Sequence, residues 1–281
     1  MRLDTFRHMP GRPDPDTEPA HLLDPADLHF TIDRYPVSPD LEPIARRFWI
    51  PVWDVPAGRE SPQRVLQYPV CLLVVSDEYV RFFGVVSGLS STTLVGRGWA
   101  LGLMFQPAAG HLLTGRPVRD LTDRFVDVES VTGLSGIRLG ARIRAIMRDD
   151  PRDEDRRAEA RTLVEDHLAT HLPIDEEGAF VNGVVEAVET TPGLLRVDDL
   201  CARFDVAERT LQRVLLKRVG MSPKWLIRRR RLQEAADRLR DADADLSGIA
   251  IELGYADQAH FTRDFRAATG LTPGRFAARF R

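Results

Sequence analysis

The chain has 281 residues, of which 43% are hydrophobic and 29% are charged, and its formal net charge is −3 at pH 7. This length predicts about two domains, and the composition excludes a fibrous, an intrinsically disordered or a membrane-embedded protein. We find no apolar run long enough to cross a membrane and no signal peptide, and the two cysteines, Cys71 and Cys201, lie in apolar stretches. We therefore expect a cytoplasmic protein with reduced thiols and no membrane partner.

The amino-acid composition of the first part of the chain changes after residue 27. Residues 1–27 contain many Pro, Asp and His residues without an apolar period, which is typical of a flexible tail. In residues 28–134, β-branched and aromatic runs of strand length alternate with Gly, Pro and Ser. These runs occupy residues 48–55, 65–68, 70–75, 80–86, 92–95 and 99–105. This spacing predicts an antiparallel β-sandwich or a small β-barrel.

One arginine and several aromatic residues of this β-rich domain are the candidates for contacts with a small molecule. They are Trp49, Trp53, Tyr68, Arg81, Phe83 and Trp99. Aromatic side chains also form the plain core of such domains, so both interpretations stay open for each of these residues.

An enzyme built on the same domain would need a metal centre or a catalytic motif. A metal-dependent cupin requires two or three His and a carboxylate at one ion, whereas this region has His29 and His111, far apart in sequence. We find no nucleophile elbow, phosphate-binding loop or cluster of thiols in the sequence. We therefore predict no catalytic residue, no metal and no cofactor, and a cupin-like enzyme is the weakest alternative.

Residues 135–175 are predicted to form linker or dimerisation helices. Apolar residues recur at helical spacing at Ile137, Ile143, Ile146 and Met147. Asp150 and Pro151 have the pattern of a helix cap followed by a proline at the first helical position. His167 and His171 have the spacing of two zinc ligands on a helix, but a solvated face is favoured because no third ligand is near in sequence. These helices would either pair two subunits in a homodimer or pack on the β-rich domain.

The last part of the chain, residues 176–281, repeats itself at a distance of fifty residues. Residues 211–213 and 220–223 are repeated, fifty residues later, at 261–263 and 270–273. Residues 200–204 are repeated at 249–253. The distance between 200–204 and 249–253 is 49 residues, one shorter than for the other stretches. A turn that is one residue shorter leaves both flanking helices intact. The repeated unit is therefore a helix, a short turn and a second helix, which is a DNA-binding layout.

The second helix of each unit must bury one stripe and leave the opposite face free for base edges in the major groove. The polar residues at the free positions are Arg209, Thr210, Gln212, Arg213 and Lys217 in the first unit, and Gln258, His260, Thr262, Arg263 and Arg266 in the second. Arg and Gln can bridge two atoms of guanine or adenine, whereas Lys217 and Arg266 are predicted to contact phosphates. Beside the buried Phe261, His260 is equally well explained as a packing residue.

The charges are divided unevenly along the chain. Residues 193–281 carry 18 Lys and Arg against 12 Asp and Glu, and the remaining residues carry 21 against 30. A basic module is therefore attached to an acidic body, which favours double-stranded DNA as the partner. The basic run 224–231 begins a helix that would join the two units rigidly and place both reading helices in successive major grooves, about 34 Å apart. The alternative for this run is a solvated helix face.

Several of these stretches resemble the AraC/XylS family of bacterial transcription regulators. The resemblance covers roughly residues 180–276, and it rests on 209–213 (RTLQR), 220–223 (GMSP), Arg230 with 235–239 (AADRL) and 249–265 (IAIELGYADQAHFTRDF). It implies base-facing positions at Arg209, Gln212, Arg213, Gln258, His260 and Arg263. The family often has Ser where this chain has Ala207 and Ala259, and the change at Ala207 removes a side-chain helix cap.

The resemblance also implies a cupin-like effector-binding domain, dimerisation through the linker helices and RNA polymerase as a candidate partner. The expected architecture is α+β: a β-rich domain, linker helices, and an all-α domain of two helix-turn-helix units joined by a long helix. We predict a sequence-specific DNA-binding transcription regulator that is modulated by a small effector or by dimerisation. The alternative is a non-specific architectural DNA-binding protein, which would bind all sequences alike with a steep salt dependence.

Overall fold

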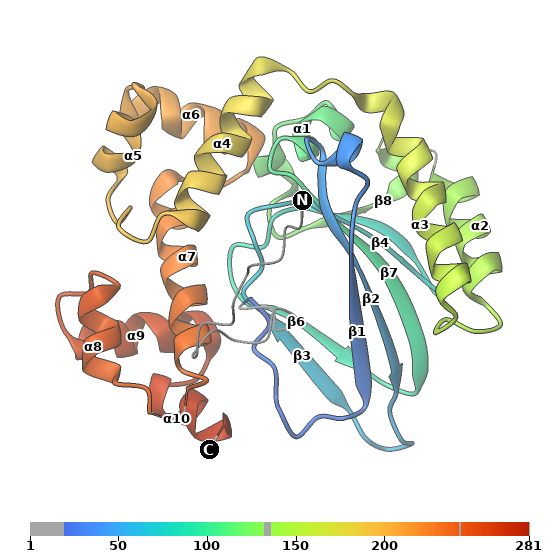
Figure 1. Ribbon diagram of the computed structural model, residues 1–281, viewed down its shortest axis with the longest axis horizontal. Helices are drawn as coiled ribbons and strands as arrows, with labels where there is room; N and C mark the ends of the chain where they lie inside the picture. Colours follow the sequence, from blue (N-terminus) through green and yellow to red (C-terminus); the bar gives the residue numbers. More distant parts are fainter. Residues whose placement is uncertain (1–19, 132–135, 242, 281) are drawn as a thin grey trace, which may run out of the picture.

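The computed structural model describes residues 20–131, 136–241 and 243–280, which form a β-rich N-terminal domain and a helical C-terminal domain (Figure 1). Most of the predicted tail lies outside the described residues. The described end of this segment is packed, because Ala20, His21 and Leu22 are buried and His21 forms an isolated β-bridge with Val65. In the described parts of the chain, no helix has the length and apolar character needed to span a bilayer.

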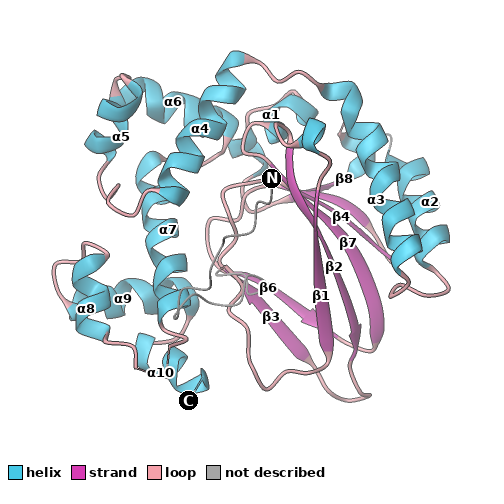
Figure 2. Ribbon diagram, in the orientation of Figure 1, coloured by secondary structure: helices cyan, strands magenta, loops and turns pink. Residues whose placement is uncertain are grey.

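Six antiparallel strands form the main sheet in the order β1-β2-β7-β4-β5-β8, and β3 and β6 pair in a second, smaller sheet (Figure 2). The strands are β1 (Phe30–Pro36), β2 (Ala45–Asp54), β3 (Ser61–Val65), β4 (Leu72–Ser76), β5 (Val80–Phe83), β6 (Ser90–Leu94), β7 (Arg97–Phe105) and β8 (Phe125–Asp127). Strands β1 and β8 are the two edges of the main sheet, so the described strands do not close into a barrel. The sandwich alternative of the prediction is the one that fits.

The two faces of the main sheet are used differently. On one face, Phe48 and Leu103 are fully buried in a core that includes Ile143 of α2 and Val164 of α3. The helices on this side are α1 (Ala109–Thr114), α2 (Gly136–Met147) and α3 (Glu154–Leu168), and Figure 1 shows α2 and α3 stacked outside the sheet. The opposite face of the main sheet is turned toward β3 and β6, and a cavity lies between them.

Two tryptophans of β2 pack on glycines of the neighbouring strand. Trp49 lies opposite Gly102 and Trp53 lies opposite Gly98 in the register of β2 and β7. A Cβ atom on Gly102 would come within 2.2 Å of the Trp49 ring, and one on Gly98 within 2.3 Å of the Trp53 ring. Only glycine leaves room for the indoles at these two positions, and the rings thereby form part of the cavity floor.

Helix α3 begins later than the sequence pattern indicates. Its N-cap is Asp153, whose side chain accepts a hydrogen bond from the backbone N–H of Arg156 at 2.9 Å. The Asp150 side chain instead accepts from the backbone N–H of Arg152 at 2.8 Å, in a turn that contains Pro151. The prediction of Asp150 as the cap and Pro151 as the first helical residue is wrong, because this local turn precedes a second acidic cap.

Helices α4 to α10 build the C-terminal domain. They are α4 (Glu176–Thr190), α5 (Val197–Phe204), α6 (Glu208–Arg218), α7 (Pro223–Arg238), α8 (Leu246–Glu252), α9 (Gln258–Thr269) and α10 (Pro273–Ala277). Short 3-10 helices are η1 (Pro39–Leu41), η2 (Val118–Leu121), η3 (Val128–Ser130), η4 (Ala169–His171) and η5 (Ala278–Phe280). The pairs α5–α6 and α8–α9 are the two predicted helix-turn-helix units.

The repeated Gly-x-Ser/Thr-Pro motif marks the end of one helix and the start of the next in both units. Gly220 and Gly270 follow α6 and α9 with φ of +79° and +78°, a conformation that glycine adopts without strain. Ser222 and Thr272 then accept hydrogen bonds from backbone N–H groups as N-caps, and a proline begins the next helix. The duplication seen in the sequence is therefore a duplication of helix boundaries.

Helix α7 is shared by both units. Leu226 and Ile227 belong to the core that contains α4, α5 and α6, whereas Leu232 and Ala235 belong to the core of α8, α9 and α10. Figure 1 shows α5 and α6 beside one end of α7 and α8 and α9 beside the other. The predicted connector helix is confirmed.

Candidate nucleic-acid interface

Helix α6 has one buried face and one exposed polar face. Leu211 and Leu215 are fully buried, and Val214 is nearly so. The exposed residues on the other side are Arg209, Thr210, Gln212 and Arg213. Gln212 donates a hydrogen bond to Glu208, one turn earlier, with a distance of 2.7 Å between Nε2 and Oε1. Ala207 makes no side-chain cap, as its sequence indicates. The predicted base-facing side chains of the first unit thus share one accessible face.

Helix α9 repeats this arrangement with aromatic anchors. Phe261 and Phe265 are fully buried, and their rings contact each other at a centroid distance of 5.8 Å. The exposed residues are Gln258, His260, Arg263 and Arg266, and Thr262 is half-buried. The carboxylate of Asp257 caps the helix by accepting from the backbone N–H of His260 at 2.6 Å. The helix therefore presents a polar face of its own.

Besides Gln212, three of the predicted DNA contacts have intramolecular partners, and one of them is Gln258, whose side-chain oxygen accepts a hydrogen bond from the Ser247 hydroxyl at 2.9 Å. The His260 ring stands perpendicular to the Tyr255 ring at a centroid distance of 5.3 Å, so it is both exposed and packed. The Lys217 ammonium forms an ion pair with Glu177 of α4 at 2.7 Å. A phosphate contact by Lys217 would therefore have to compete with the Glu177 carboxylate.

An ion cluster joins α6 to the start of α4. The Arg218 side chain is 4% exposed and pairs with both Asp175 and Glu177. The hydrogen bond from Arg218 lowers the pKa of Asp175, and hydrogen bonds from Lys217 and Arg218 lower the pKa of Glu177. The two carboxylates compensate a guanidinium that would otherwise be buried without a counter-charge.

We expect this cluster to weaken in acid. A carboxylate whose pKa is lowered by folding adds stability above its unfolded pKa, and this contribution is lost as the pH falls through the lower, folded pKa. At pH 7 the wild type should be more stable than Glu177→Gln by up to about 1 kcal/mol. This difference should shrink below pH 4.5, the ordinary value for Glu177. Denaturant titrations across this range measure it, and a difference that stays constant would contradict the assignment.

The basic run on α7 does not form a surface patch. Arg229 and Arg230 are only 5% and 6% exposed, Arg228 pairs with Asp264, and the Arg231 guanidinium lies over the Tyr255 ring. Neither a solvated face nor a DNA-binding face describes Arg229 and Arg230, which are buried, whereas the Arg228 side chain is 43% exposed beside its contact with Asp264.

A cavity of about 260 Å³ lies between the main sheet and the β3–β6 pair. Its walls include four of the predicted effector contacts, Trp49, Trp53, Tyr68 and Phe83. The other two lie elsewhere: Trp99 is buried in the core on the other face of the sheet, and Arg81 lies between the rings of Tyr79 and Phe125. The sequence did not indicate several other wall residues, among them Phe30, Ile32, Pro51 and Met104.

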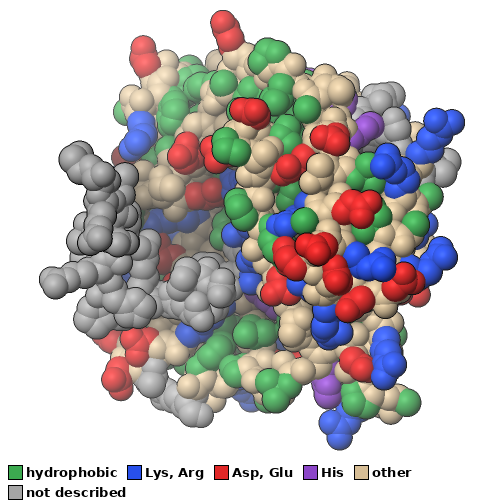
Figure 3. Space-filling model, turned by 45° about the vertical axis from the view of Figure 1, so that its right-hand side comes forward, with side chains coloured by type: hydrophobic (Ala, Val, Ile, Leu, Met, Phe, Trp, Pro, Cys, Tyr) green, Lys and Arg blue, Asp and Glu red, His purple; other side chains and the backbone are tan. Residues whose placement is uncertain are grey.

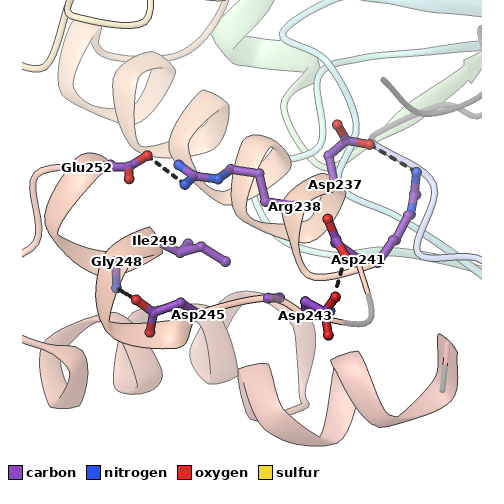
Figure 4. Close-up of a pocket in the computed structure, with 10 residues that line it drawn as sticks. Asp237, Arg238, Asp241, Asp243, Asp245, Gly248, Ile249 and Glu252 are labelled. Carbon is purple, nitrogen blue, oxygen red and sulfur yellow. Dashed lines mark hydrogen bonds and ion pairs between the residues drawn. The ribbon is translucent and has the colours of Figure 1, made fainter. Parts of the chain in front are cut away.

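A second depression, between the end of α7 and α8, is lined mainly by charged residues, and several of them are engaged in contacts within the chain. Figure 4 shows Arg238 paired with Glu252, at 2.6 Å, and Asp245 accepting from the backbone N–H of Gly248 at the start of α8. Asp241 accepts from the backbone N–H of Asp243. Within residues 20–131, 136–241 and 243–280, no three His, Cys, Asp or Glu side chains are grouped to hold a metal ion. We assign this depression a structural role.

Comparisons with known proteins match the two domains separately. A family model described as a helix-turn-helix domain matches residues 200–279, and one described as a domain of unknown function matches residues 33–127. The HTH-type transcriptional activator RhaS of Pectobacterium carotovorum is 39% identical over 74 residues, which are 26% of this chain and 26% of RhaS. The activator RhaR of Yersinia pseudotuberculosis is 27% identical over 115 residues, 41% of this chain and 40% of RhaR. The match thus spans less than half of either relative.

Among solved structures, a probable AraC family transcriptional regulator from Rhodopseudomonas palustris is 27% identical, and the match covers 35% of this chain and 94% of that one with a TM-score of 0.32. ToxT from Vibrio cholerae is 11% identical, with 90% of this chain and 99% of ToxT covered and a TM-score of 0.39. The helix-turn-helix match, the named relatives and the duplicated motif agree on the C-terminal part of the chain. This part, residues 200–279, is a helix-turn-helix domain of the AraC/XylS family.

Proposed function

We propose that the protein is a sequence-specific DNA-binding transcription regulator whose N-terminal domain responds to a small molecule, and that it acts by binding rather than by catalysis. The observation that carries this proposal is the pair of exposed polar faces on α6 and α9, held by one connector helix. Each face offers Arg and Gln side chains with the hydrogen-bonding geometry that reads guanine and adenine.

In this proposal the two helices share the work of recognition. Arg209, Gln212 and Arg213 of α6, and Gln258, His260 and Arg263 of α9, contact base edges in successive major grooves. Thr210 and Thr262 lie at the border of these faces, and Arg266 contacts a phosphate, as does Lys217 once Glu177 releases it. The two half-sites then lie about one helical turn apart on the same side of the duplex.

The effector would bind in the cavity between the two sheets. Its floor is the indole pair of Trp49 and Trp53, and Tyr68 and Phe83 add aromatic walls, so a ligand with a flat or extended apolar body fits it best. The cavity extends over both sheets, and an occupant would therefore change the packing between them.

Two segments in the cavity wall also hold α7. Val65 and Gln67 line the cavity, and the carbonyl of Leu66 between them accepts a hydrogen bond from Gln233 of α7 at 2.6 Å. Val86 lines the cavity as well, and the carbonyls of the next two residues accept from Arg229 at 2.7 and 2.8 Å. A ligand can change DNA binding only through unequal affinity for two domain arrangements, and these segments offer the physical link.

The contact through Arg229 is suited to release. Its guanidinium is buried against neutral carbonyl groups of Val86, Ser87 and Gly88, and its NH1 atom has no hydrogen-bond partner. Burial lowers the pKa of Arg229 to about 10, so the group still carries its charge at pH 7. Among the described residues Arg229 forms no ion pair, although the charge of Asp123 acts on it. A buried charge held mainly by carbonyl groups costs free energy, which makes this domain contact easy to exchange for another.

A homodimer and contact with RNA polymerase complete the proposed set of partners. The apolar stripes of α2 and α3 already pack within the chain, because Leu139, Ile143, Val164 and Leu168 are buried in the core of the N-terminal domain. Their outward side chains mix Arg with Asp and Glu (Figure 3). A dimer through these helices would therefore use charge pairs at its surface rather than a large apolar seam.

The proposal is tested by comparing affinities at several salt concentrations. A site is first selected from random DNA with the full chain, and its dissociation constant is then measured beside that of a scrambled duplex. We expect the selected site to bind about 10³-fold or more tightly, as specific regulators do. Equal affinity for both duplexes, with a steep loss as salt rises, would instead identify a non-specific architectural protein.

A further inference from the structure

Four consecutive arginines of α7, Arg228 to Arg231, contact four different parts of the molecule. Successive residues of an α-helix point about 100° apart, so four in a row cover the whole circumference of the helix. Arg228 contacts α9, Arg229 contacts the loop after β5, Arg230 contacts the segment between α4 and α5, and Arg231 contacts the turn before α9. The helix is therefore fixed from all sides by its own basic residues.

Arg228 ties α7 to the second reading helix. Its Nε atom donates to Oδ1 of Asp264 at 2.8 Å, and its NH2 atom lies 2.8 Å from the same oxygen. The other carboxylate oxygen of Asp264 accepts from the hydroxyl of Tyr255 at 2.9 Å. Asp264 lies on α9 one turn after His260, but its side chain is only 18% exposed and is engaged by Arg228 and Tyr255, so this contact bears on the orientation of α9.

Arg231, about one helical turn after Arg228, contacts the same tyrosine that binds Asp264. Its guanidinium carbon lies 3.9 Å from the centroid of the Tyr255 ring, within the range of a cation–π interaction. Its Nε and NH2 atoms are buried without a hydrogen-bond partner, which leaves the ring as the partner that the geometry supplies. Arg228, Asp264, Tyr255 and Arg231 thus form a continuous chain of contacts from α7 to the start of α9 and back.

Arg230 holds the first unit on the opposite side of α7. Its NH1 atom donates to the carbonyl of Pro192 at 3.0 Å, and its NH2 atom pairs with Glu234 at 2.6 Å. Pro192 lies between α4 and α5, where the first helix-turn-helix unit begins. The two units are therefore attached to α7 by neighbouring arginines that face different directions.

We propose that Arg228, Arg230 and Arg231 are positioning residues that set the separation and angle between α6 and α9, and thereby the spacing of the two DNA half-sites. This inference rests on the proposed function. A rigid pair of readers tolerates only one half-site spacing, because each added base pair moves the second site about 3.4 Å along the duplex and rotates it about 35°.

The experiment measures a spacing profile on the selected site. Duplexes with base pairs inserted or removed between the half-sites are titrated with the full chain, and affinity is plotted against spacing. For the wild type we expect a single optimum and a loss of about tenfold or more for one inserted base pair. Asp264→Asn and Arg231→Leu should flatten this profile by at least about threefold, because α9 then turns more freely on α7.

Two controls separate positioning from other roles. Arg229→Ala removes a buried arginine of the same helix that contacts the loop after β5 and the ring of Trp225 on α7 itself, and neither belongs to the second unit. Its profile should therefore keep the wild-type shape even if the affinity shifts evenly. Asp264→Asn removes a negative charge, so a lost phosphate contact cannot explain its effect. The affinity of each variant for each isolated half-site should stay near the wild-type value. This result would show that both units remain folded.

The outcomes decide between the alternatives. A wild-type profile in Asp264→Asn and Arg231→Leu would overturn the positioning role, as would a wild type that tolerates every spacing. A uniform loss at all spacings in Arg228→Ala, with a shallower salt dependence, would assign Arg228 to a phosphate instead. A wild type that selects no DNA sequence would reject the proposed function itself, which is a different result from either of these.

Discussion

Phe265→Ala should destabilise the C-terminal domain by about 3 to 5 kcal/mol, which is the usual cost of truncating a fully buried phenylalanine. Phe265 is completely buried, and its ring contacts Phe261 and Phe276 at centroid distances of 5.8 and 5.7 Å. It thus joins α9 to α10 in the core that also contains Leu232 and Ala235 of α7. The loss should appear in denaturant titrations followed by far-ultraviolet circular dichroism.

The control for this prediction is an apolar side chain of the same unit that lies at the surface. Ile251 of α8 is 71% exposed, and Ile251→Ala should change the free energy of unfolding by no more than about 0.5 kcal/mol. A Phe265→Ala variant as stable as this control would show that the cluster of Phe261, Phe265 and Phe276 does not anchor the second reading helix.

Arg213→Ala and Arg263→Ala should each weaken binding to the selected site by about 1 to 3 kcal/mol and relax the preference at one base pair. Both side chains are exposed on the polar faces of α6 and α9. A lost bidentate contact removes the discrimination at its own base pair and leaves the other positions of the site unchanged. The measurement is affinity for the selected site and for each of its single-base variants.

Lys217→Ala is the matched control, because Lys217 lies on α6 with Arg213 and is predicted to contact a phosphate. Its loss should weaken binding by a similar factor on every sequence and lower the salt dependence by about one ion. If Arg213→Ala and Arg263→Ala also weaken all sequences equally, base reading by these two residues is wrong.

The helix boundaries of the two helix-turn-helix units, unlike the start of α3, could be predicted from the sequence because they follow local rules. Gly220 and Gly270 end helices, Ser222 and Thr272 cap the next ones, and the spacing of Leu211 and Leu215 marks a buried stripe. Each of these signals lies within a few residues of its effect.

Strands were harder to predict because pairing is not local. Strands β1 and β3 contain charged and polar residues, as in FTIDRYP and SPQRV, and they become strands by pairing with β2 and β6. The cavity lies between these sheets, so Phe30 and Ile32 could not be recognised as wall residues. Its aromatic ring makes Trp99 a candidate contact, but the alternation along β7 places it on the core face.

The arginine run shows how composition alone can mislead about a surface. Four consecutive positive charges indicate a basic patch, yet helical rotation sends Arg228 to Asp264, Arg229 to backbone carbonyls and Arg231 to a tyrosine ring. The partners come from distant parts of the chain, which no local pattern reveals.

If α6 and α9 read two half-sites side by side, base-removal interference on the selected site should locate both of them. Each duplex lacks one base, and the duplexes that the full chain binds are separated from those that stay unbound. We predict two patches of interference in adjacent major grooves on one face of the duplex, centred about 10 base pairs apart. A single patch, or two patches on opposite faces, would contradict this arrangement of the two helices.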